Sequence, residues 1–329
     1  MSEWVLGIDG GGSKTEAWLA PRLAPEGAGK STPEHLLPVG RGLAGSSNLT
    51  TLGAAGSLSA IANAADQAFR VAGMSACRVE AACLAVAGSA RLDLRRELEG
   101  RALGELARAV FVVHDAAPVL ACVDDDGAGI AVISGTGSIV FGRNRRGQVA
   151  RAGGFGALYS DPGSGFDLSR RAIVAVLSAH DGTGPETSLS GLFLERFSAA
   201  DVAGLIEALH RTGFDPAAIA THADLVDLAA QRGDAVAMQI LRTAAARLAD
   251  GVVAVARKLS LRLTDTALGL AGGVLIRSPM LAPTLEQELS SRGLAPRTRT
   301  IVRQPVAGAV LLARGLLEPG FDPGSWWWT

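Results

Sequence analysis

The stretch IDGGGSKT, residues 8–15 of a 329-residue chain, decides the fold. A carboxylate and three consecutive glycines end an apolar run in which Trp4, Leu6 and Ile8 alternate with smaller residues. The alternation resumes in TEAWLA, so the pattern predicts a β-hairpin with a glycine-rich tip. A glycine triplet costs conformational entropy on folding, which leads us to expect that a ligand approaches this backbone closely.

The composition is that of a globular protein with more than one domain. Hydrophobic residues make up 48% of the chain, which carries 41 glycines and a formal net charge of −1. At this length two domains are expected. Because acidic and basic residues are mixed along the chain, we expect a small-molecule partner and neither a nucleic-acid nor a membrane surface. Cys77, Cys83 and Cys122 lack CxxC spacing and no secretory or membrane-spanning segment is recognised, so a cytoplasmic protein is predicted.

The opening pattern recurs later in the chain. GIAVISGTGSIVFG, residues 129–142, is again an apolar run, a tip of Gly, Ser and Thr, and a second apolar run; a turn and a third strand follow. Another glycine-broken strand, TALGLAGGVLI, spans residues 266–276. The longest helical stretches are expected over 48–73 and 235–261. Strands followed by helices, with glycine turns at strand ends, predict an α/β protein of two related halves that binds ligands at the carboxyl ends of its strands.

Two of the glycine-rich tips are suited to phosphate. Glycine loops can turn backbone N–H groups toward an anion because no Cβ obstructs its approach. GGGSKT and SGTGS also carry the hydroxyl groups of Ser13, Thr15, Ser134, Thr136 and Ser138. We therefore predict that two facing loops hold a polyphosphate from both sides. In LAGGV, Gly272 and Gly273 would let a flat group such as a nucleoside lie on the backbone, and a turn or packing role for this pair stays open.

Two aspartates end apolar runs. Asp9 precedes the first tip, where a carboxylate would face phosphates unless a cation such as Mg²⁺ intervenes; a plain turn residue is the alternative. Asp115 ends AVFVVHD and is followed by small residues, so it is placed to accept the proton of a hydroxyl nucleophile. An N-cap of the helix expected near Pro118 is a compatible second role for Asp115. His114 is expected to be a packing or hydrogen-bonded residue.

One apparent phosphate motif is rejected. APEGAGKS, residues 24–31, fits a permissive Walker A pattern, which requires a preceding strand and a following helix. Prolines on both sides of the segment make neither element expected.

Six segments, in the order DGGGSKT, AGSSN, HDA, ISGTGS, GGFGALYSDPGSGF and LAGGV, resemble the N-acetylglucosamine kinase branch of the actin, hexokinase and heat-shock-cognate chaperone superfamily. The same branch includes ATPases that activate benzoyl-CoA reductase-type enzymes. The resemblance spans nearly the whole chain and implies two ribonuclease-H-like, actin-like ATPase domains hinged around a central nucleotide and sugar cleft. Residues 1–118, completed by a C-terminal helix within 305–329, would form the first domain, and residues 119–304 the second.

The resemblance also implies a role for each matching position. It implies an ATP- and Mg²⁺-dependent kinase of the 6-hydroxyl of an amino sugar, with Asp115 as general base and Asp9 organising Mg²⁺. The phosphates would lie between Gly11, Gly12, Ser13, Lys14 and Thr15 on one side and Ser134, Gly135, Thr136, Gly137 and Ser138 on the other. Adenosine would lie on Gly272 and Gly273, with Ala229 near the base. The sugar would contact Asn48, Asp115, Gly153, Gly154, Phe155 and Asp161.

Two positions depart from the family pattern. Phe155 stands where relatives often carry Trp in GGWG, and Pro162 where they carry Glu in GDEGS. In the family both positions shape the surroundings of the sugar and its N-acetyl group, so these departures leave the identity of the amino sugar open. The resemblance makes N-acetylglucosamine the first choice of substrate, with glucosamine or an N-acetylmuramic-type sugar as alternatives. An ATPase that activates a partner enzyme is a further alternative, which the scattered cysteines disfavour. The terminal WWW, residues 326–328, could pack on the first domain, form a homodimer interface or be a loose end.

Overall fold

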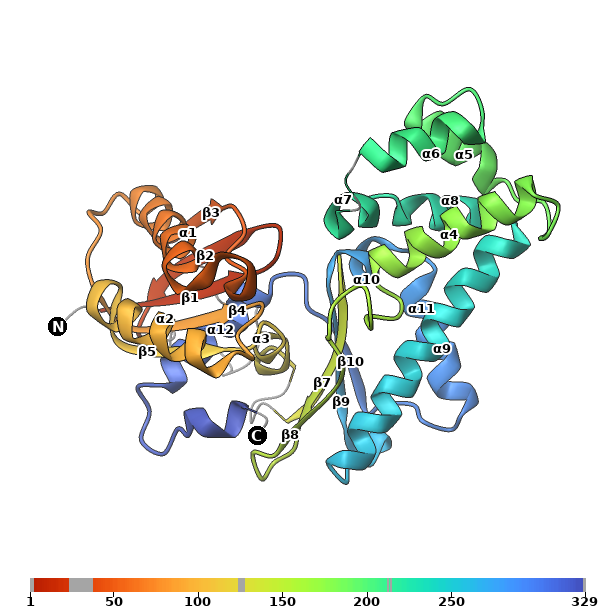
Figure 1. Cartoon of the computed structure of the whole chain (residues 1–329). Helices are drawn as coiled ribbons and strands as arrows, with labels where there is room; N and C mark the ends of the chain where they lie inside the picture. The colour runs from red at the N-terminus through yellow and green to blue at the C-terminus, as the bar shows by residue number, and fades with distance from the viewer. Residues whose placement is uncertain (1–2, 24–37, 124–127, 212, 214, 328–329) are drawn as a thin grey trace.

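The computed structural model describes residues 3–23, 38–123, 128–211, 213 and 215–327. Figure 1 shows two lobes side by side, one built from the first third of the chain and its C-terminal segment, the other from the remainder. Each lobe contains a five-stranded sheet. The rejected Walker-like segment, residues 24–31, lies outside the described residues.

The two sheets share one topology. The first has the order β3-β2-β1-β4-β5, and the second, read in the same sense, has the order β8-β7-β6-β9-β10. In each sheet the glycine-tipped hairpin is antiparallel and the next strand pairs parallel to its first member. The predicted α/β class and the recurrence of the opening hairpin are therefore confirmed. The strands are β1 (Trp4–Gly10), β2 (Thr15–Pro21), β3 (Gly40–Ala44), β4 (Val79–Val86), β5 (Ala107–Val113), β6 (Gly129–Ser134), β7 (Ser138–Arg143), β8 (Val149–Gly153), β9 (Ala267–Ala271) and β10 (Thr298–Ile301).

Three helices of the first lobe follow the first hairpin. The long helix α1 (Leu49–Val71) begins at one of the two predicted caps, Asn48, and bends at Gly53, where φ is 66°. Helix α2 (Leu92–Glu105) was not predicted from the sequence, because only two of its residues are buried and it shows little apolar periodicity. The short helix α3 (Ala117–Ala121) follows β5.

Helices of the second lobe lie mostly on the side of its sheet that faces away from the first lobe (Figure 1). They are α4 (Gly165–His180), α5 (Leu189–Phe197), α6 (Val202–Arg211), α7 (Pro216–Ala220), α8 (Ala223–Gln231), α9 (Ala235–Lys258), α10 (Gly273–Arg277) and α11 (Leu281–Ser291). The helix α6 begins at Val202 and does not include Ser198, because Ser198 adopts the left-handed conformation that ends α5. Within the described part of the chain, no helix combines the length and apolar character needed to cross a membrane.

The last helix, α12 (Pro305–Gly315), returns to the first sheet. A Cβ added to Gly7 would lie 2.6 Å from the backbone nitrogen of Val310, so β1 and α12 are in close contact. One apolar core contains Phe111 of β5, Phe141 of β7 and Val306 of α12, and it therefore spans both sheets. This arrangement supports, as a proposal, a first domain that is completed by the C-terminal helix, whereas the boundary predicted between residues 118 and 119 falls within α3 (Ala117–Ala121).

The C-terminal tail contacts both lobes of its own chain. Trp326 ends a short 3₁₀ helix, η3 (Pro323–Trp326), and is 4% exposed in the shared core. The guanidinium of Arg143, on β7, lies 4.5 Å from the Trp326 ring, and that of Arg95, on α2, lies 3.8 Å from the Trp327 ring. Packing within the chain accounts for these two tryptophans, and Trp328 lies outside the described residues.

Candidate active site

The first glycine-rich tip joins β1 to β2. Gly10 is required by packing, because a Cβ there would collide with Ser47 Oγ. The turn closes through the N–H of Gly11, which donates to Lys14 O at 2.9 Å. At Gly12 an added Cβ would meet nothing within 4 Å, and at Gly11 nothing nearer than Lys14 O at 3.5 Å. The packing of the chain therefore does not explain why Gly11 and Gly12 are glycines.

Some backbone N–H donors of this tip make no hydrogen bond within the described part of the chain. Within the described residues, the N–H groups of Gly12 and Ser13 make no hydrogen bond. Lys14 is exposed and its ammonium lies 3.3 Å from a neighbouring glutamate. Thr15, in contrast, is buried, and its hydroxyl donates to Gly45 O at 2.7 Å. Gly12, Ser13 and Lys14 can face an anion, whereas Thr15 supports the loop.

Asn48 lies beside this tip, in the segment that enters α1. The N–H of Ser47 donates to Gly11 O at 3.3 Å and holds the segment against the tip. Asn48 Oδ1 caps the helix by accepting the N–H groups of Thr50 at 3.0 Å and Thr51 at 3.3 Å. Asn48 Nδ2 makes no hydrogen bond to the described part of the chain. Its amide group is therefore available to a ligand hydroxyl.

Asp115 lies just past the end of β5. Because β1, β4 and β5 are parallel neighbours, Asp115 and Asp9 lie at the same carboxyl edge of the sheet. His114 Nδ1 lies 2.7 Å from Asp115 Oδ1. Burial disfavours the charged form of Asp115, but the adjacent His114 ring holds the pKa of this carboxyl below its usual value. The alternative role of Asp115 as a helix cap is wrong, because the N-cap of α3 is Ala116.

Asp9 has the opposite electrostatic environment. Burial raises the pKa of Asp9 to about 7, and the negative charges of Asp115 and then Glu16 act in the same direction, against Lys14. Negative charge is therefore concentrated beside the first tip. A cation at Asp9 would relieve this repulsion, so the residues present fit a metal ion with oxygen ligands.

The second glycine-rich tip, residues 134–138, joins β6 to β7. Its two serine hydroxyls donate to a later segment of the chain: Ser134 Oγ to Gly163 O at 2.6 Å, and Ser138 Oγ to Pro162 O at 2.8 Å. The protons of both hydroxyls are thus used within the protein. The predicted contribution of these serines to phosphate binding is therefore indirect, through the position of the tip.

In the second tip, backbone carbonyls are bonded within the protein, whereas two backbone N–H groups make no hydrogen bond to the described part of the chain. The carbonyl of Gly135 accepts the N–H of Gly165, at the start of α4, at 2.8 Å. Among the described residues nothing accepts a hydrogen bond from the N–H groups of Thr136 and Gly137, and the Thr136 side chain is exposed. Each of the two tips thus presents at least two backbone N–H groups that make no hydrogen bond within the described residues.

The glycine pair after β9 lies against the second tip. Gly272 has φ of 92°, and a Cβ there would collide with the backbone of Ser134, so a turn and packing role accounts for this residue. At Gly273 the nearest atom to an added Cβ would be in the flexible Arg277 side chain, at 3.1 Å. Ala229 is fully buried in the core of the second lobe. In this structure its side chain offers no surface to a nucleotide base.

The segment 153–161 also approaches the second tip. Gly153, Gly154 and Asp161 have φ values of 75°, 71° and 63°. Asp161 is 5% exposed, and a Cβ added to Gly137 would lie 2.6 Å from its Oδ2. Burial raises the pKa of Asp161, against hydrogen bonds from nearby backbone N–H groups. Its Oδ1 has no hydrogen-bond partner in the described residues, and Phe155 is 65% exposed nearby in the sequence.

The predicted residues are thus assembled as two clusters, one at each sheet. The first contains Asp9, the tip at 11–15, Asn48 and Asp115, and the second contains the tip at 134–138, Gly153, Gly154, Asp161, Gly272 and Gly273. Sequence reasoning missed Gly163 and Gly165, which hold the second tip. The PGSG run at 162–165 was the available signal, because closely spaced glycines permit the positive φ found at Gly163.

Comparisons with known proteins agree on one family. The model of the BadF/BadG/BcrA/BcrD ATPase family matches residues 6–313. An N-acetylmuramic acid/N-acetylglucosamine kinase from Clostridium acetobutylicum is 32% identical over 95% of this chain and 98% of its own length. An N-acetyl-D-glucosamine kinase from Dictyostelium discoideum is 28% identical over 94% and 98%. The crystal structure of a candidate N-acetylglucosamine kinase from Chromobacterium violaceum superposes with a TM-score of 0.72 at 25% identity, covering 95% of this chain and 99% of the other.

Proposed function

The chain belongs to the BadF/BadG/BcrA/BcrD ATPase family, and on this premise we propose that it is an ATP-dependent sugar kinase acting on the 6-hydroxyl of an amino sugar. N-acetylglucosamine is the first choice of substrate, because both curated relatives are named for it. N-acetylmuramic acid is the second choice, because the relative with 32% identity is named for both sugars.

The unbonded backbone N–H groups carry this proposal. Gly12 and Ser13 present two of them, and Thr136 and Gly137 present two more. Backbone donors in glycine loops suit the spread negative charge of a triphosphate, and phosphoryl transfer depends mainly on such positioning and charge stabilisation. An ATP whose phosphates lie between the tips would also explain why Gly11 and Gly12 lack side chains.

Asp115 is the proposed general base. Its lowered pKa keeps the carboxyl ionised near neutral pH, so it can accept the proton of a sugar hydroxyl as the oxygen attacks the γ-phosphate. His114 Nδ1, which accepts the N–H of Ala116 at 3.1 Å, lies 2.7 Å from Asp115 Oδ1, and this oxygen makes no hydrogen bond to the described part of the chain. The Asn48 amide and the segment with Gly153, Gly154, Phe155 and Asp161 would hold the sugar.

Mg²⁺ is the proposed metal, and Asp9 would hold it. The concentrated negative charge around Asp9 supports this assignment. When bound, Mg²⁺ neutralises phosphate charge. The proposal also includes ATP and the sugar as partners and a cytoplasmic location. That location is supported by three free cysteines, of which Cys77 is exposed.

The test is sugar-dependent ADP release by the purified protein with ATP and Mg²⁺. N-acetylglucosamine, N-acetylmuramic acid, glucosamine and glucose would be compared, and we expect one of the first two to give the largest kcat/KM. Asp115→Asn should lower kcat by at least about 100-fold, because removal of a general base costs roughly that factor.

Asp93→Asn is the matched control. It replaces an exposed carboxylate that pairs with Arg91 at 2.7 Å on the same lobe, and it should leave kcat unchanged. The kinase proposal is rejected if no sugar stimulates ADP release or if Asp115→Asn retains full activity. ADP release that no sugar stimulates would instead favour an ATPase that acts on a partner enzyme.

A further inference from the structure

The start of α4 is built around the buried carboxylate of Asp167. Asp167 is 8% exposed, and its backbone N–H donates to Ser164 Oγ at 3.1 Å. In return, Asp167 Oδ2 accepts the N–H of Gly163 at 3.0 Å. A helix cap paired with an acidic residue three positions later satisfies two backbone donors together. The two bonds therefore fix the direction in which the segment 162–165 enters the helix.

The same segment, residues 162–165, is hydrogen-bonded to the second glycine-rich tip, residues 134–138. Gly163 O accepts the hydroxyl of Ser134 at 2.6 Å, and the N–H of Gly165 donates to Gly135 O at 2.8 Å. Gly163 has φ of 74°, so its N–H and carbonyl directions depend on an unusual backbone conformation. A change in the position of Gly163 would move Ser134 and Gly135, and with them the unbonded N–H groups of the tip.

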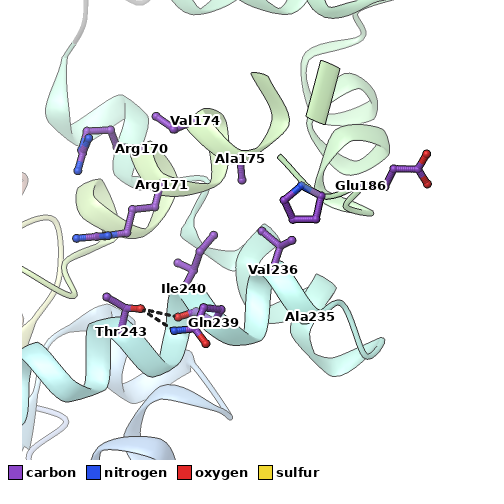
Figure 2. Close-up of a pocket in the computed structure, with 11 residues that line it drawn as sticks. Arg170, Arg171, Val174, Ala175, Glu186, Ala235, Val236, Gln239, Ile240 and Thr243 are labelled. Carbon is purple, nitrogen blue, oxygen red and sulfur yellow. Dashed lines mark hydrogen bonds between the residues drawn. The ribbon is translucent and has the colours of Figure 1, made fainter. Parts of the chain in front are cut away.

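Two arginines contact the other carboxylate oxygen of Asp167. Arg171 Nε donates to Asp167 Oδ1 at 2.9 Å, and Arg170 Nη2 lies 3.6 Å from the same oxygen. A buried carboxylate without such partners would be costly, so the two arginines help to hold the Asp167 side chain in place. Both arginines line a groove of about 550 Å³ between α4 and α9. Figure 2 shows their two side chains at one end of this groove, with Gln239 and Thr243 on α9.

We infer that Asp167 is a positioning residue for nucleotide binding. It acts through Gly163 on the second glycine-rich tip, and Arg171 holds it in the orientation that this requires. This inference rests on the proposed use of ATP at the two tips. It does not depend on which sugar is phosphorylated.

Asp167→Ala removes the acceptor of the Gly163 N–H and should raise the KM for ATP about tenfold, the effect of losing one hydrogen bond to a charged group. The KM for the sugar should change less than about twofold. Asp167→Asn keeps an oxygen that can accept from Gly163, so it should recover part of the ATP affinity. Steady-state kinetics with each substrate varied in turn separates the two constants.

Asp224→Ala is the matched control, because it breaks another aspartate–arginine pair of the same lobe, with Arg196 at 2.6 Å, away from the tip. It should leave the KM for ATP unchanged. If Asp167→Ala does not fold, as judged by thermal unfolding, Arg171→Gln decides. A folded Asp167→Ala or Arg171→Gln variant with a wild-type KM for ATP overturns the inference.

Calorimetric titration of ADP without sugar distinguishes this inference from the proposed function. If the wild-type protein binds ADP but phosphorylates no sugar, the kinase proposal fails while the role of Asp167 is still measured by the Kd for ADP. We expect the Kd of Asp167→Ala for ADP to be about tenfold larger than that of the wild type. An equal Kd for both proteins contradicts the positioning role.

Discussion

Two carboxylates at one sheet edge, Asp9 and Asp115, have pKa values shifted in opposite directions. Burial raises the pKa of Asp9 to about 7, helped by the charge of Asp115. The His114 ring overcomes the same effect of burial at Asp115 and lowers its pKa. Neighbouring carboxyl groups with different pKa values are typical of active sites in which one group transfers a proton and the other has a different role, such as binding a cation. At the scale of single residues, the different surroundings of these two aspartates therefore suit Asp9 to a cation and Asp115 to accepting a proton.

Asp9 should make the stability of the nucleotide-free protein fall as the pH rises. Its carboxyl keeps a proton up to about pH 7 in the folded state but loses it near 3.8 in the unfolded chain. The folded state thus binds more protons between these values, and its free energy of unfolding decreases across this window. From about pH 5 to about pH 8, the wild type should lose on the order of 2 kcal/mol more than Asp9→Asn, measured by urea unfolding.

Equal pH dependence of the two proteins would show that the Asp9 carboxyl is not perturbed. Added Mg²⁺ offers a second check on the same residue. Because a metal ion binds the ionised carboxylate, Mg²⁺ should stabilise the wild type more as the pH rises, and Asp9→Asn should lack this gain.

At the scale of the elements, Asn48 connects a helix end to the proposed sugar site. Its Oδ1 caps the first turn of α1, and its Nδ2 is unbonded within the described chain. The bend at Gly53 separates that first turn from the rest of the helix. The contribution of the Asn48 cap to the free energy of unfolding should therefore be modest. Its capping role can then be measured separately from its proposed contact with the sugar.

Asn48→Asp should separate capping from sugar binding. Aspartate keeps an acceptor for the cap, so the free energy of unfolding should stay within about 0.5 kcal/mol of wild type, whereas Asn48→Ala should lose about 1 kcal/mol. Both variants lack the amide donor, so both should raise the KM for the sugar by about tenfold. Urea unfolding and steady-state kinetics give the two quantities. An unchanged sugar KM in Asn48→Asp would remove Asn48 from the sugar site.

At the scale of the whole molecule, one apolar core joins the two lobes. It contains residues of both sheets, of α12 and of the C-terminal tail. Arg143 of the second sheet also donates from Nε to Ser325 O at 3.0 Å, next to Trp326. The C-terminal tail therefore contacts both the second sheet and the first lobe and helps to hold them together (Figure 1).

Trp326→Ala should destabilise the whole protein by about 3 kcal/mol, because it empties a large volume in the shared core. Trp327→Ala is the control, since this half-buried ring contacts the Arg95 guanidinium and its loss should cost about 1 kcal/mol or less. Urea unfolding followed by fluorescence and by circular dichroism measures both. A wild-type midpoint for Trp326→Ala would show that the tail does not hold the lobes together.

The sequence by itself determined the local features of this protein. Apolar runs on both sides of the glycine tips, alternating in the first hairpin, predicted both hairpins. Small polar residues before an alanine-rich run predicted the start of α1 at Asn48 or Thr50. These signals are local, because period, turn residues and helix caps act over a few positions. The order of the motifs also implied the ribonuclease-H-like, actin-like fold, which the repeated sheet topology confirms.

Only the tertiary structure decided which side chains serve a ligand and which serve the fold. Ser134 and Ser138 donate to a segment more than twenty residues away, Ala229 is inside the core, and Asp167 acts on Gly163. The sequence shows that such residues are polar, small or acidic, but not where their partners lie. A hydrogen-bond donor satisfied within the chain is not free for a substrate, and that depends on contacts formed when distant segments pack together.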